Sequence, residues 1–428
     1  MGVLSDAKLG WGALRELLRG RAVRSKLAAQ LAARAPLPRN RFVIGVYFAD
    51  APVNLYQMRQ WYAPLVELAK THPVVILSRS PAGTSALLAE SPIPVAYVRK
   101  VSDLEDFLLE HELKIVLYVN QNARNFQMMR YGRRWHVFVN HGESDKMYMT
   151  TNQFKAYDYS FVAGDAAVAR LQRVLWDFDF DKRAIPIGRP QADHYRGVTP
   201  FPADGRTIVL YAPTWEGDRS AAAYGSIATH GEALVRAVLS SPTHRLIYRP
   251  HPRSGVLDPA YAAANRSIVA AIHAANAADP EAQHVYDTGA ELGWQLAAAD
   301  VAVVDISAMV YDRLATGKPL LITRPVSPDA AIDTGGYLSD CEWLTVDEAP
   351  HALARIEQVS HDSAANVRLG RWVTHYFGDT TPGAATRRFH KAIDHLLAEW
   401  DRNAALHARD EPVDLREISA EADAEEKS

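Results

Sequence analysis

The chain has 428 residues, which is too long for one typical domain and predicts two or three. A hydrophobic content of 48% supports sizeable cores, and a formal net charge of −3 argues against nucleic acid as a partner. The single cysteine, Cys341, excludes an intramolecular disulfide. The sequence shows no zinc-ligand spacing, no apolar run long enough to span a membrane and no signal-peptide pattern. A cytoplasmic enzyme or binding protein is the expected class.

The first 40 residues form a basic segment. Nine Lys and Arg residues lie between residues 1 and 41, against Asp6 and Glu16, and Trp and Leu residues interleave with them at roughly helical spacing. A basic amphipathic helix of this kind predicts contact with an anionic membrane surface. The alternative is a helix that packs on the body of the protein with its arginines in solvent. Pro36 and Pro38 then mark a linker.

Residues 41–203 alternate short strands and helices, which predicts an α/β domain with a parallel sheet. The expected strands are Phe42–Phe48, Val74–Leu77, Val95–Val98, Ile115–Val119, Trp135–Asn140, Tyr159–Val162 and Ile185–Ile187. Ser102 and Glu105 predict a capping box ahead of a helix over Leu104–Leu113. No G-x-G-x-x-G follows the first strand, so the dinucleotide-binding fingerprint is missing.

Residues 204–400 repeat this alternation and predict a second α/β domain. The expected strands are Ile208–Ala212, Arg245–Tyr248, Val285–Tyr286, Val301–Val304 and Leu320–Thr323, and the expected helices include Gly231–Ser240, Pro259–Ala275, Glu291–Ala298 and Pro382–Trp400. Phe201–Gly205 is a plausible hinge between the halves. Two Rossmann-like domains joined in this way resemble the B-type (GT-B) glycosyltransferase architecture, whose cleft lies between the domains. Residues 401–428 form an acidic tail.

The segment Ala299–Arg324 is a compact strand, turn, helix and strand unit. The apolar run Val301–Val304 ends at Asp305, and Ser307 stands at the N-cap position of a short helix that Gly317 closes. The hydroxyl group and backbone N–H groups at such a helix N-terminus are a natural site for a phosphate. The alternative is an ordinary capped helix of an α/β protein.

Polar motifs follow four of the predicted strands directly. They are His141–Gly142, Thr214–Trp215, His251–Pro252–Arg253 and Asp305–Ser307. Because ligands of open parallel sheets bind beyond the carboxyl ends of the strands, four motifs at such ends predict a ligand cleft.

Histidine and arginine in these motifs suit phosphate chemistry. His141 is a candidate general base, with a loop histidine that bonds a carbonyl as the alternative. Arg249 and Arg253 flank His251 in a proline-stiffened loop and match phosphate oxygens, although a rigid surface loop with ordinary ion pairs is the alternative. Thr214 is a candidate hydrogen-bond donor to a phosphate. Lys146 either pairs with a phosphate or lies in solvent.

The ordered set of motifs resembles the CDP-glycerol glycerophosphotransferase family, the teichoic-acid primases and polymerases. The motifs are His141-Gly with Lys146, Gly188-x-Pro-x-x-Asp193, Tyr211-Ala-Pro-Thr214, His251-Pro, Asp305-x-Ser307-x-x-x-Tyr311-Asp312, Lys318-Pro, Gly335-Gly-Tyr337, Gly378-Asp379 and Gly383-Ala-Ala-Thr-Arg387. The likeness covers roughly residues 135 to 390. It implies a GT-B fold, a CDP-alditol donor and a lipid-linked acceptor at the cytoplasmic face of the membrane. It also implies His141 as the base and His251 as a second catalytic or donor-phosphate histidine.

The sequence therefore predicts a cytoplasmic, membrane-peripheral transferase of glycerol phosphate or a related group. His141 and His251 are its expected catalytic residues, and Thr214, Arg249, Arg253, Asp305, Ser307 and Lys146 are its expected donor-phosphate ligands. No metal cage and no cofactor are expected, and a loosely held Mg²⁺ stays compatible with the sequence. The alternatives are a glycosyltransferase that uses a nucleotide sugar and a non-catalytic nucleotide- or glycan-binding protein.

Overall fold

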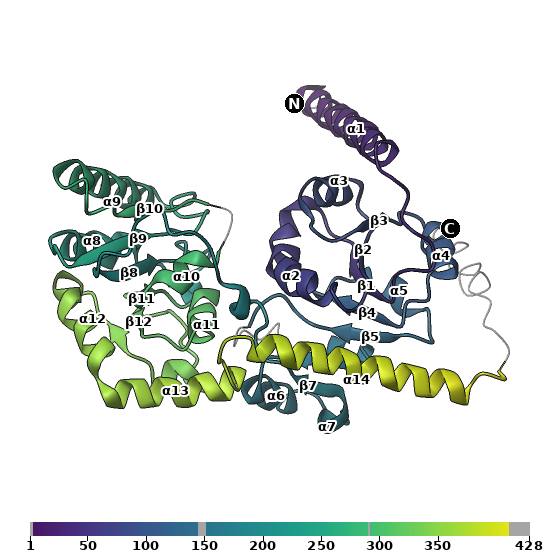
Figure 1. The fold of residues 1–428 in the computed structure, drawn as a ribbon. Helices are drawn as coiled ribbons and strands as arrows, with labels where there is room; N and C mark the ends of the chain where they lie inside the picture. Colours follow the sequence, from purple (N-terminus) through teal and green to yellow (C-terminus); the bar gives the residue numbers. More distant parts are fainter. Residues whose placement is uncertain (1–2, 144–150, 290–291, 411–428) are drawn as a thin grey trace.

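The computed structural model describes residues 3–143, 151–289 and 292–410, with side chains from Leu18 onward. Two separate parallel sheets form the body of the chain (Figure 1). The first sheet has the order β3-β2-β1-β4-β5-β6-β7 and the second the order β10-β9-β8-β11-β12-β13. The strands are β1 (Ile44–Phe48), β2 (Val74–Ser78), β3 (Val95–Tyr97), β4 (Ile115–Tyr118), β5 (Trp135–Phe138), β6 (Tyr159–Val162), β7 (Ala184–Pro186), β8 (Thr207–Ala212), β9 (His244–Tyr248), β10 (Val285–Tyr286), β11 (Val301–Val304), β12 (Leu320–Thr323) and β13 (Trp343–Leu344). The predicted two-domain α/β fold class is confirmed.

Helices lie along both sheets. They are α1 (Val3–Ala32), α2 (Leu55–Leu68), α3 (Pro81–Glu90), α4 (Val101–Glu110), α5 (Asn125–Met129), α6 (Asp165–Gln172), α7 (Phe180–Arg183), α8 (Glu232–Leu239), α9 (Pro259–Ala278), α10 (Trp294–Ala298), α11 (Ala308–Leu314), α12 (Ala352–His361), α13 (Ser363–Phe377) and α14 (Ala384–Leu406). Helix α14 continues into the segment that the sequence assigned to the acidic tail.

Two details differ from the sequence prediction. Strand β13 was not predicted, because two residues carry no readable pattern. The predicted capping box at Ser102 is wrong: α4 begins at Val101, and the Asp103 carboxylate accepts a hydrogen bond from the Lys100 backbone N–H at 2.9 Å. Glu105 is buried and accepts a hydrogen bond from the Tyr131 hydroxyl group at 3.0 Å instead.

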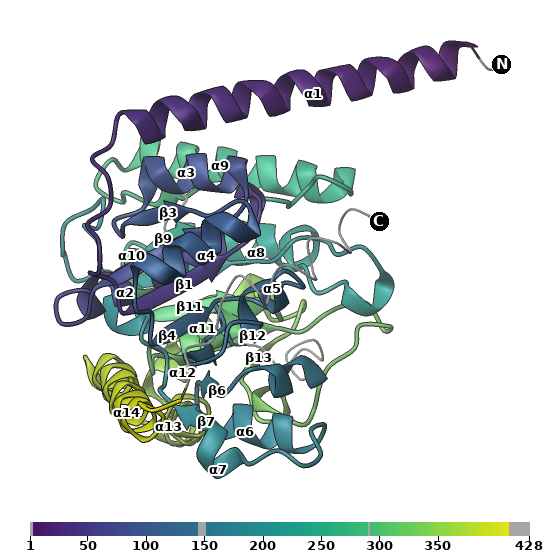
Figure 2. The ribbon, with the colours of Figure 1, turned by 90° about the vertical axis from the view of Figure 1, so that its right-hand side faces the viewer.

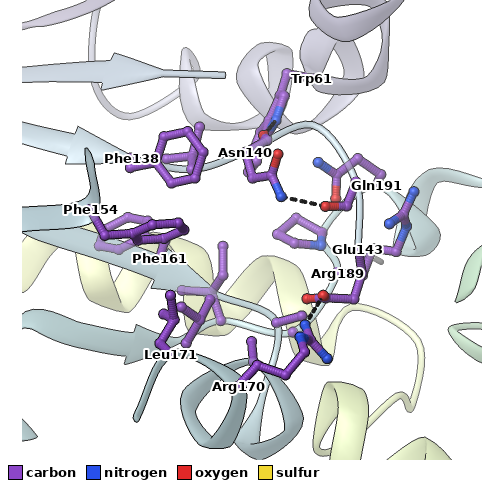
Figure 3. A pocket seen from close by; sticks show the side chains of 18 residues that line it. Trp61, Phe138, Asn140, Glu143, Phe154, Phe161, Arg170, Leu171, Arg189 and Gln191 are labelled. Atoms are coloured by element: carbon purple, nitrogen blue, oxygen red, sulfur yellow. Dashed lines mark hydrogen bonds and ion pairs between the residues drawn. The ribbon is translucent and has the colours of Figure 1, made fainter. Parts of the chain in front are cut away.

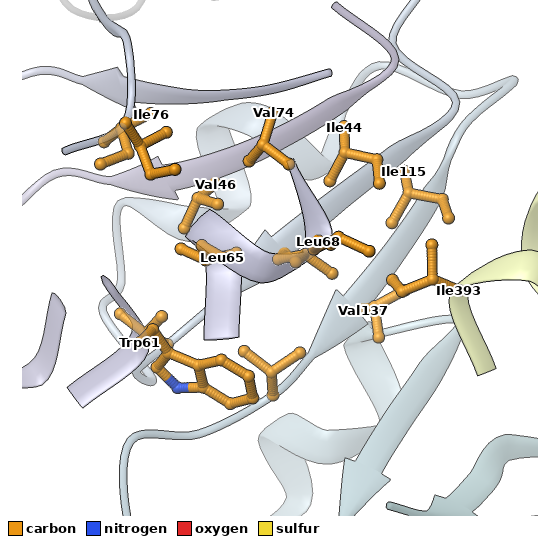
Figure 4. Packing of buried hydrophobic residues seen from close by; sticks show 14 of the residues in the cluster. Ile44, Val46, Trp61, Leu65, Leu68, Val74, Ile76, Ile115, Val137 and Ile393 are labelled. Atoms are coloured by element: carbon orange, nitrogen blue, oxygen red, sulfur yellow. The ribbon is translucent and has the colours of Figure 1, made fainter. Parts of the chain in front are cut away.

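The core of the first domain includes the end of the chain. Ile44 and Val46 of β1 pack in one buried cluster with Trp61 and Leu65 of α2 and with Ile393 of α14 (Figure 4). Helix α14 crosses from the second domain along the first (Figure 1). The last helix therefore ties the two domains together by burying apolar surface.

Polar contacts anchor the crossing points between the domains. The Asp193 carboxylate accepts hydrogen bonds from Gly383 N at 3.0 Å and from Thr386 N at 2.7 Å, which satisfies the first N–H groups of α14. In the predicted hinge, Asp204 accepts hydrogen bonds from the buried Arg245 of β9 at 2.8 and 3.1 Å. The connecting segment is thus fixed to the second sheet.

Helix α1 packs on the first domain near its C-terminal end. Leu27 is buried, and the hydroxyl group of Ser85 in α3 donates a hydrogen bond of 2.6 Å to the Gln30 side-chain oxygen. The N-terminal part of α1 extends beyond the rest of the molecule (Figure 2). No helix among the described residues combines the length and the apolar character needed to cross a membrane.

Candidate active site

The motifs that follow β8, β9 and β11 meet at one edge of the second sheet, because these strands are neighbours in the order β9-β8-β11. The backbone N–H of His251 donates to the Pro213 carbonyl at 3.1 Å. The Thr214 N–H donates to the Asp305 carboxylate at 2.7 Å. The structure thus brings together three motifs that are separated by long stretches of sequence.

Asp305 lies beneath this edge and has no exposed surface. Its carboxylate accepts hydrogen bonds from Thr214 N, from Ser226 N at 3.0 Å and from the Thr323 hydroxyl group. Burial raises the pKa of Asp305 to about 6. All of these contacts are within the protein, and the predicted contact of Asp305 with a phosphate stays a prediction. Asp305 is a positioning residue that holds three loops together.

Ser307 caps α11 as predicted. Its hydroxyl oxygen accepts the Met309 N–H at 3.3 Å, and its hydroxyl group donates to the Asp305 carbonyl at 3.2 Å. The side chain is half-buried at the same edge as Thr214. Lys146 lies outside the described residues.

The protonation of His251 follows from its contacts. Its Nδ1 accepts the backbone N–H of Arg253 at 3.1 Å, so the neutral ring carries its proton on Nε2. The Arg253 guanidinium lies 3.9 Å from the centre of the Trp215 ring and is exposed. An N–H donor on His251 and a cation beside it are suited to bind an anionic group such as a phosphate.

The loop that carries His251 is held by Glu216, which sequence reasoning missed. Its buried carboxylate accepts the backbone N–H groups of Gly255, Leu257 and Asp258 at 2.7 to 3.0 Å. Burial alone would raise the pKa of Glu216, but these hydrogen bonds outweigh it and lower the pKa. Nearby, Arg249 forms an ion pair with Asp287.

His141 follows β5 in the first domain and has the opposite tautomer. Its Nδ1 lies 2.9 Å from the Val119 carbonyl oxygen, which can only accept, so Nδ1 carries the proton and Nε2 keeps its lone pair. Burial lowers the pKa of His141, which keeps the ring neutral near pH 7. A neutral imidazole with an oriented lone pair has the properties of a general base.

A buried ion pair joins the domains beside His141. Arg189, after β7, pairs with Asp312 of α11, and both side chains are at most 7% exposed. Tyr195 supports the pair through its hydroxyl group, 3.2 Å from Arg189 Nε. The resemblance named Asp312 but left position 189 unspecified, and nothing in the sequence showed that Arg189 and Asp312 meet.

A second ion pair, between Glu143 and Arg170, lines the same small pocket as Arg189. Figure 3 shows the charged side chains on one side of this pocket and aromatic side chains on the other, namely Phe138, Phe154 and Phe161. Among the described residues, no group of three or more His, Cys, Asp or Glu side chains is arranged to hold a metal ion.

No protein-family model and no curated protein matches the chain. Solved structures, in contrast, match the chain over most of its length. A variant of the wall teichoic acid polymerase TagF soaked with CDPG matches with a TM-score of 0.53 and 11% identity, over 93% of this chain and 99% of that chain. A UDP-GlcNAc 2-epimerase from Neisseria meningitidis bound to UDP-GlcNAc matches with a TM-score of 0.55 and 13% identity, over 83% and 99% of the two chains. The chain shares their fold. It has the two-domain α/β architecture of GT-B glycosyltransferases.

Proposed function

We propose that this chain transfers glycerol phosphate, or a related alditol phosphate, from a CDP-activated donor to a hydroxyl group of a lipid-linked or glycan acceptor in the synthesis of a cell-wall polymer. The fixed tautomer of His141 carries this proposal, because a buried neutral histidine with its Nε2 lone pair available is suited to deprotonate a hydroxyl group. The fold shared with a teichoic acid polymerase supports the choice of reaction.

The proposed step balances without a further reactant. His141 Nε2 takes the proton of the acceptor hydroxyl group as the acceptor oxygen bonds to the phosphorus of the alditol phosphate. The phosphoanhydride P–O bond of the donor breaks, and CMP leaves with the electron pair. Because phosphoryl transfer depends mainly on positioning and charge stabilisation, few protein groups need to react.

The edge of the second sheet supplies the groups that would hold the donor diphosphate. His251 offers its Nε2–H, Arg253 an exposed guanidinium and Thr214 a half-buried hydroxyl group. Arg249 adds the N–H groups of its guanidinium that do not pair with Asp287. Ser307 adds its hydroxyl group at the N-terminus of α11. These donors would stabilise the charge that develops on the departing phosphate.

Peripheral contact with the cytoplasmic face of an anionic membrane is part of the proposal. Among the described side chains of α1, the basic ones before its packed end are all exposed, namely Arg19, Arg21, Arg24 and Lys26. Each basic residue near an anionic surface contributes about 1 kcal/mol of attraction. The part of α1 that extends from the body would bring the active site close to a lipid-linked acceptor.

A nucleotide-sugar donor is the second candidate, because the epimerase structure that binds UDP-GlcNAc has the same fold. A donor panel separates the two. CMP release from CDP-glycerol or CDP-ribitol, measured with and without a glycan acceptor, supports the first proposal. Release of UDP or GDP from a nucleotide sugar supports the second. No release and no thermal shift with any donor would contradict both.

A further inference from the structure

A second cavity, of about 300 Å³, lies at the carboxyl ends of three strands of the first sheet. It is lined by Asp50 and Asn54 after β1, by Gln57 of α2, by Asn120, Gln121 and Asn122 after β4, and by Phe138, Asn140 and His141 at the end of β5. Its volume falls at the lower end of the roughly 300–1,000 Å³ that small-molecule sites occupy. The open ends of β1, β4 and β5 are also where ligands of parallel sheets bind.

The lining is polar but carries little charge. Six of the nine side chains are amides, one is the carboxylate of Asp50, one is the imidazole of His141, and Phe138 alone is apolar. Among the described residues that line the cavity there is no Lys or Arg, so none of these residues supplies a cation for a phosphate. An amide both donates and accepts hydrogen bonds, as a hydroxyl group does. The cavity is therefore complementary to a neutral ligand with several hydroxyl groups.

Hydrogen bonds hold these side chains in place. The two carboxylate oxygens of Asp50 accept from Asn54 Nδ2 at 2.8 Å and from Asn120 Nδ2 at 2.7 Å. Asn120 Nδ2 also donates to Gln57 Oε1 at 2.6 Å, and Gln121 Oε1 accepts from the Thr151 hydroxyl group at 2.8 Å. A carboxylate has about four acceptor sites, so Asp50 keeps lone pairs for ligand hydroxyl groups. Such preorganised groups lose little entropy when a ligand binds.

The candidate base lies in the wall of this cavity. His141 lines it, and Tyr56, whose side chain is half exposed, meets the His141 ring edge-to-face with centroids 5.7 Å apart. An exposed aromatic ring beside the cavity offers an apolar surface for the C–H face of a carbohydrate. A hydroxyl group of a ligand held by the amides would thus lie beside the general base.

We infer that this cavity binds the acceptor, and that the acceptor presents a neutral polyhydroxylated group, an alditol or a carbohydrate, to His141. This inference rests on the proposed function for its role but not for the binding itself. The charged part of a lipid-linked acceptor would lie outside the cavity.

Binding can be measured without any nucleotide, by saturation-transfer NMR on the full chain. The neutral probes are glycerol, ribitol and methyl glucoside, and glycerol 3-phosphate is the charged comparison. The wild type should bind at least one neutral probe and prefer it to the phosphate. Asp50→Asn should weaken that binding at least 10-fold, the effect expected for losing a hydrogen bond to a charged group. Gln121→Ala, at a half-buried loop position, should weaken it as well.

Gln153→Ala is the matched control, because Gln153 is exposed and does not line the cavity. It should bind the probe like the wild type. Binding of CDP-glycerol and of UDP-GlcNAc is measured on the same proteins. If no nucleotide binds but the polyol does, the proposed function fails and the cavity assignment stands. Absence of polyol binding in the wild type, equal binding of the phosphate, or binding that neither variant at Asp50 or Gln121 affects would overturn the assignment.

Discussion

Replacing Asp305 tests whether this buried carboxylate holds together the loops after β8, β11 and β12. Asp305→Ala leaves the buried N–H groups of Thr214 and Ser226 and the Thr323 hydroxyl group without their acceptor. At about 1–3 kcal/mol for each of the three unsatisfied groups, the variant should lose about 3–9 kcal/mol of unfolding free energy. Asp305→Asn should lose little, because its amide oxygen can accept both N–H groups while its Nδ2 donates to the Thr323 oxygen.

The pH dependence of the unfolding free energy distinguishes the protonated from the ionised form of Asp305. The folded pKa of about 6 lies above the ordinary value of 3.8, so the folded state binds this proton more tightly than the unfolded state. The stability that this proton contributes is complete below pH 3.8 and is lost as pH rises through 6. The difference between a pKa of about 6 in the folded state and 3.8 in the unfolded state corresponds to about 3 kcal/mol.

The assay is urea unfolding of wild type, Asp305→Asn and Asp305→Ala at several pH values between 4 and 7. The Asn variant has no proton to lose, so it should gain on the wild type by up to about 3 kcal/mol as pH rises over this interval. A difference between wild type and Asn variant that does not change with pH would refute the raised pKa. Equal stability of the Ala and Asn variants would refute the role of the three hydrogen bonds.

Three further predictions concern the site and the N-terminal helix. Ser307→Ala should cost about 1 kcal/mol of stability through the lost cap. It should also weaken the binding of CDP-glycerol by about 1–3 kcal/mol and leave the binding of cytidine unchanged. Titrations with both ligands check this, and equal losses for the two would show that Ser307 only caps its helix. Deleting residues 1–26 spares the buried Leu27 and the contact of Gln30 with Ser85. The deletion should weaken binding to anionic vesicles and leave the thermal unfolding transition unchanged. A truncated chain that fails to fold, or that binds vesicles as before, would contradict this prediction. Because burial lowers the pKa of His141 below 6.5, kcat/KM should rise with pH along a limb centred below 6.5 and level off by neutral pH, and a limb centred well above 7 would assign the base to another group.

The sequence predicted the sheets well because buried parallel strands are short apolar runs between turn residues. Twelve strands were expected near their observed positions, and the strand–helix unit around Ser307 was correct, including its cap. The meeting of the motifs after β8, β9 and β11 followed from a general property of parallel sheets, that residues after neighbouring strands lie at the same edge.

The direction of a side chain after a strand was not predictable in the same way. Asp305 and Ser307 are two residues apart, yet one points into the core and the other lies at the surface edge. Arg189 and Asp312 are 123 residues apart and meet only because α11 approaches the end of β7. The amide-lined cavity combines three loops, each of which reads as an ordinary polar turn in the sequence.

The general base is the central claim, and His141→Ala tests it most directly. Transfer is followed as CMP release from the active donor in the presence of acceptor, and donor affinity is measured on the same protein. His361→Ala serves as the control, because this histidine is exposed on α12, in the other domain. We predict that His141→Ala binds the donor almost normally but transfers roughly 100- to 10,000-fold more slowly, the usual effect of losing a positioned general base. Near-normal transfer by the folded His141→Ala protein would contradict the account.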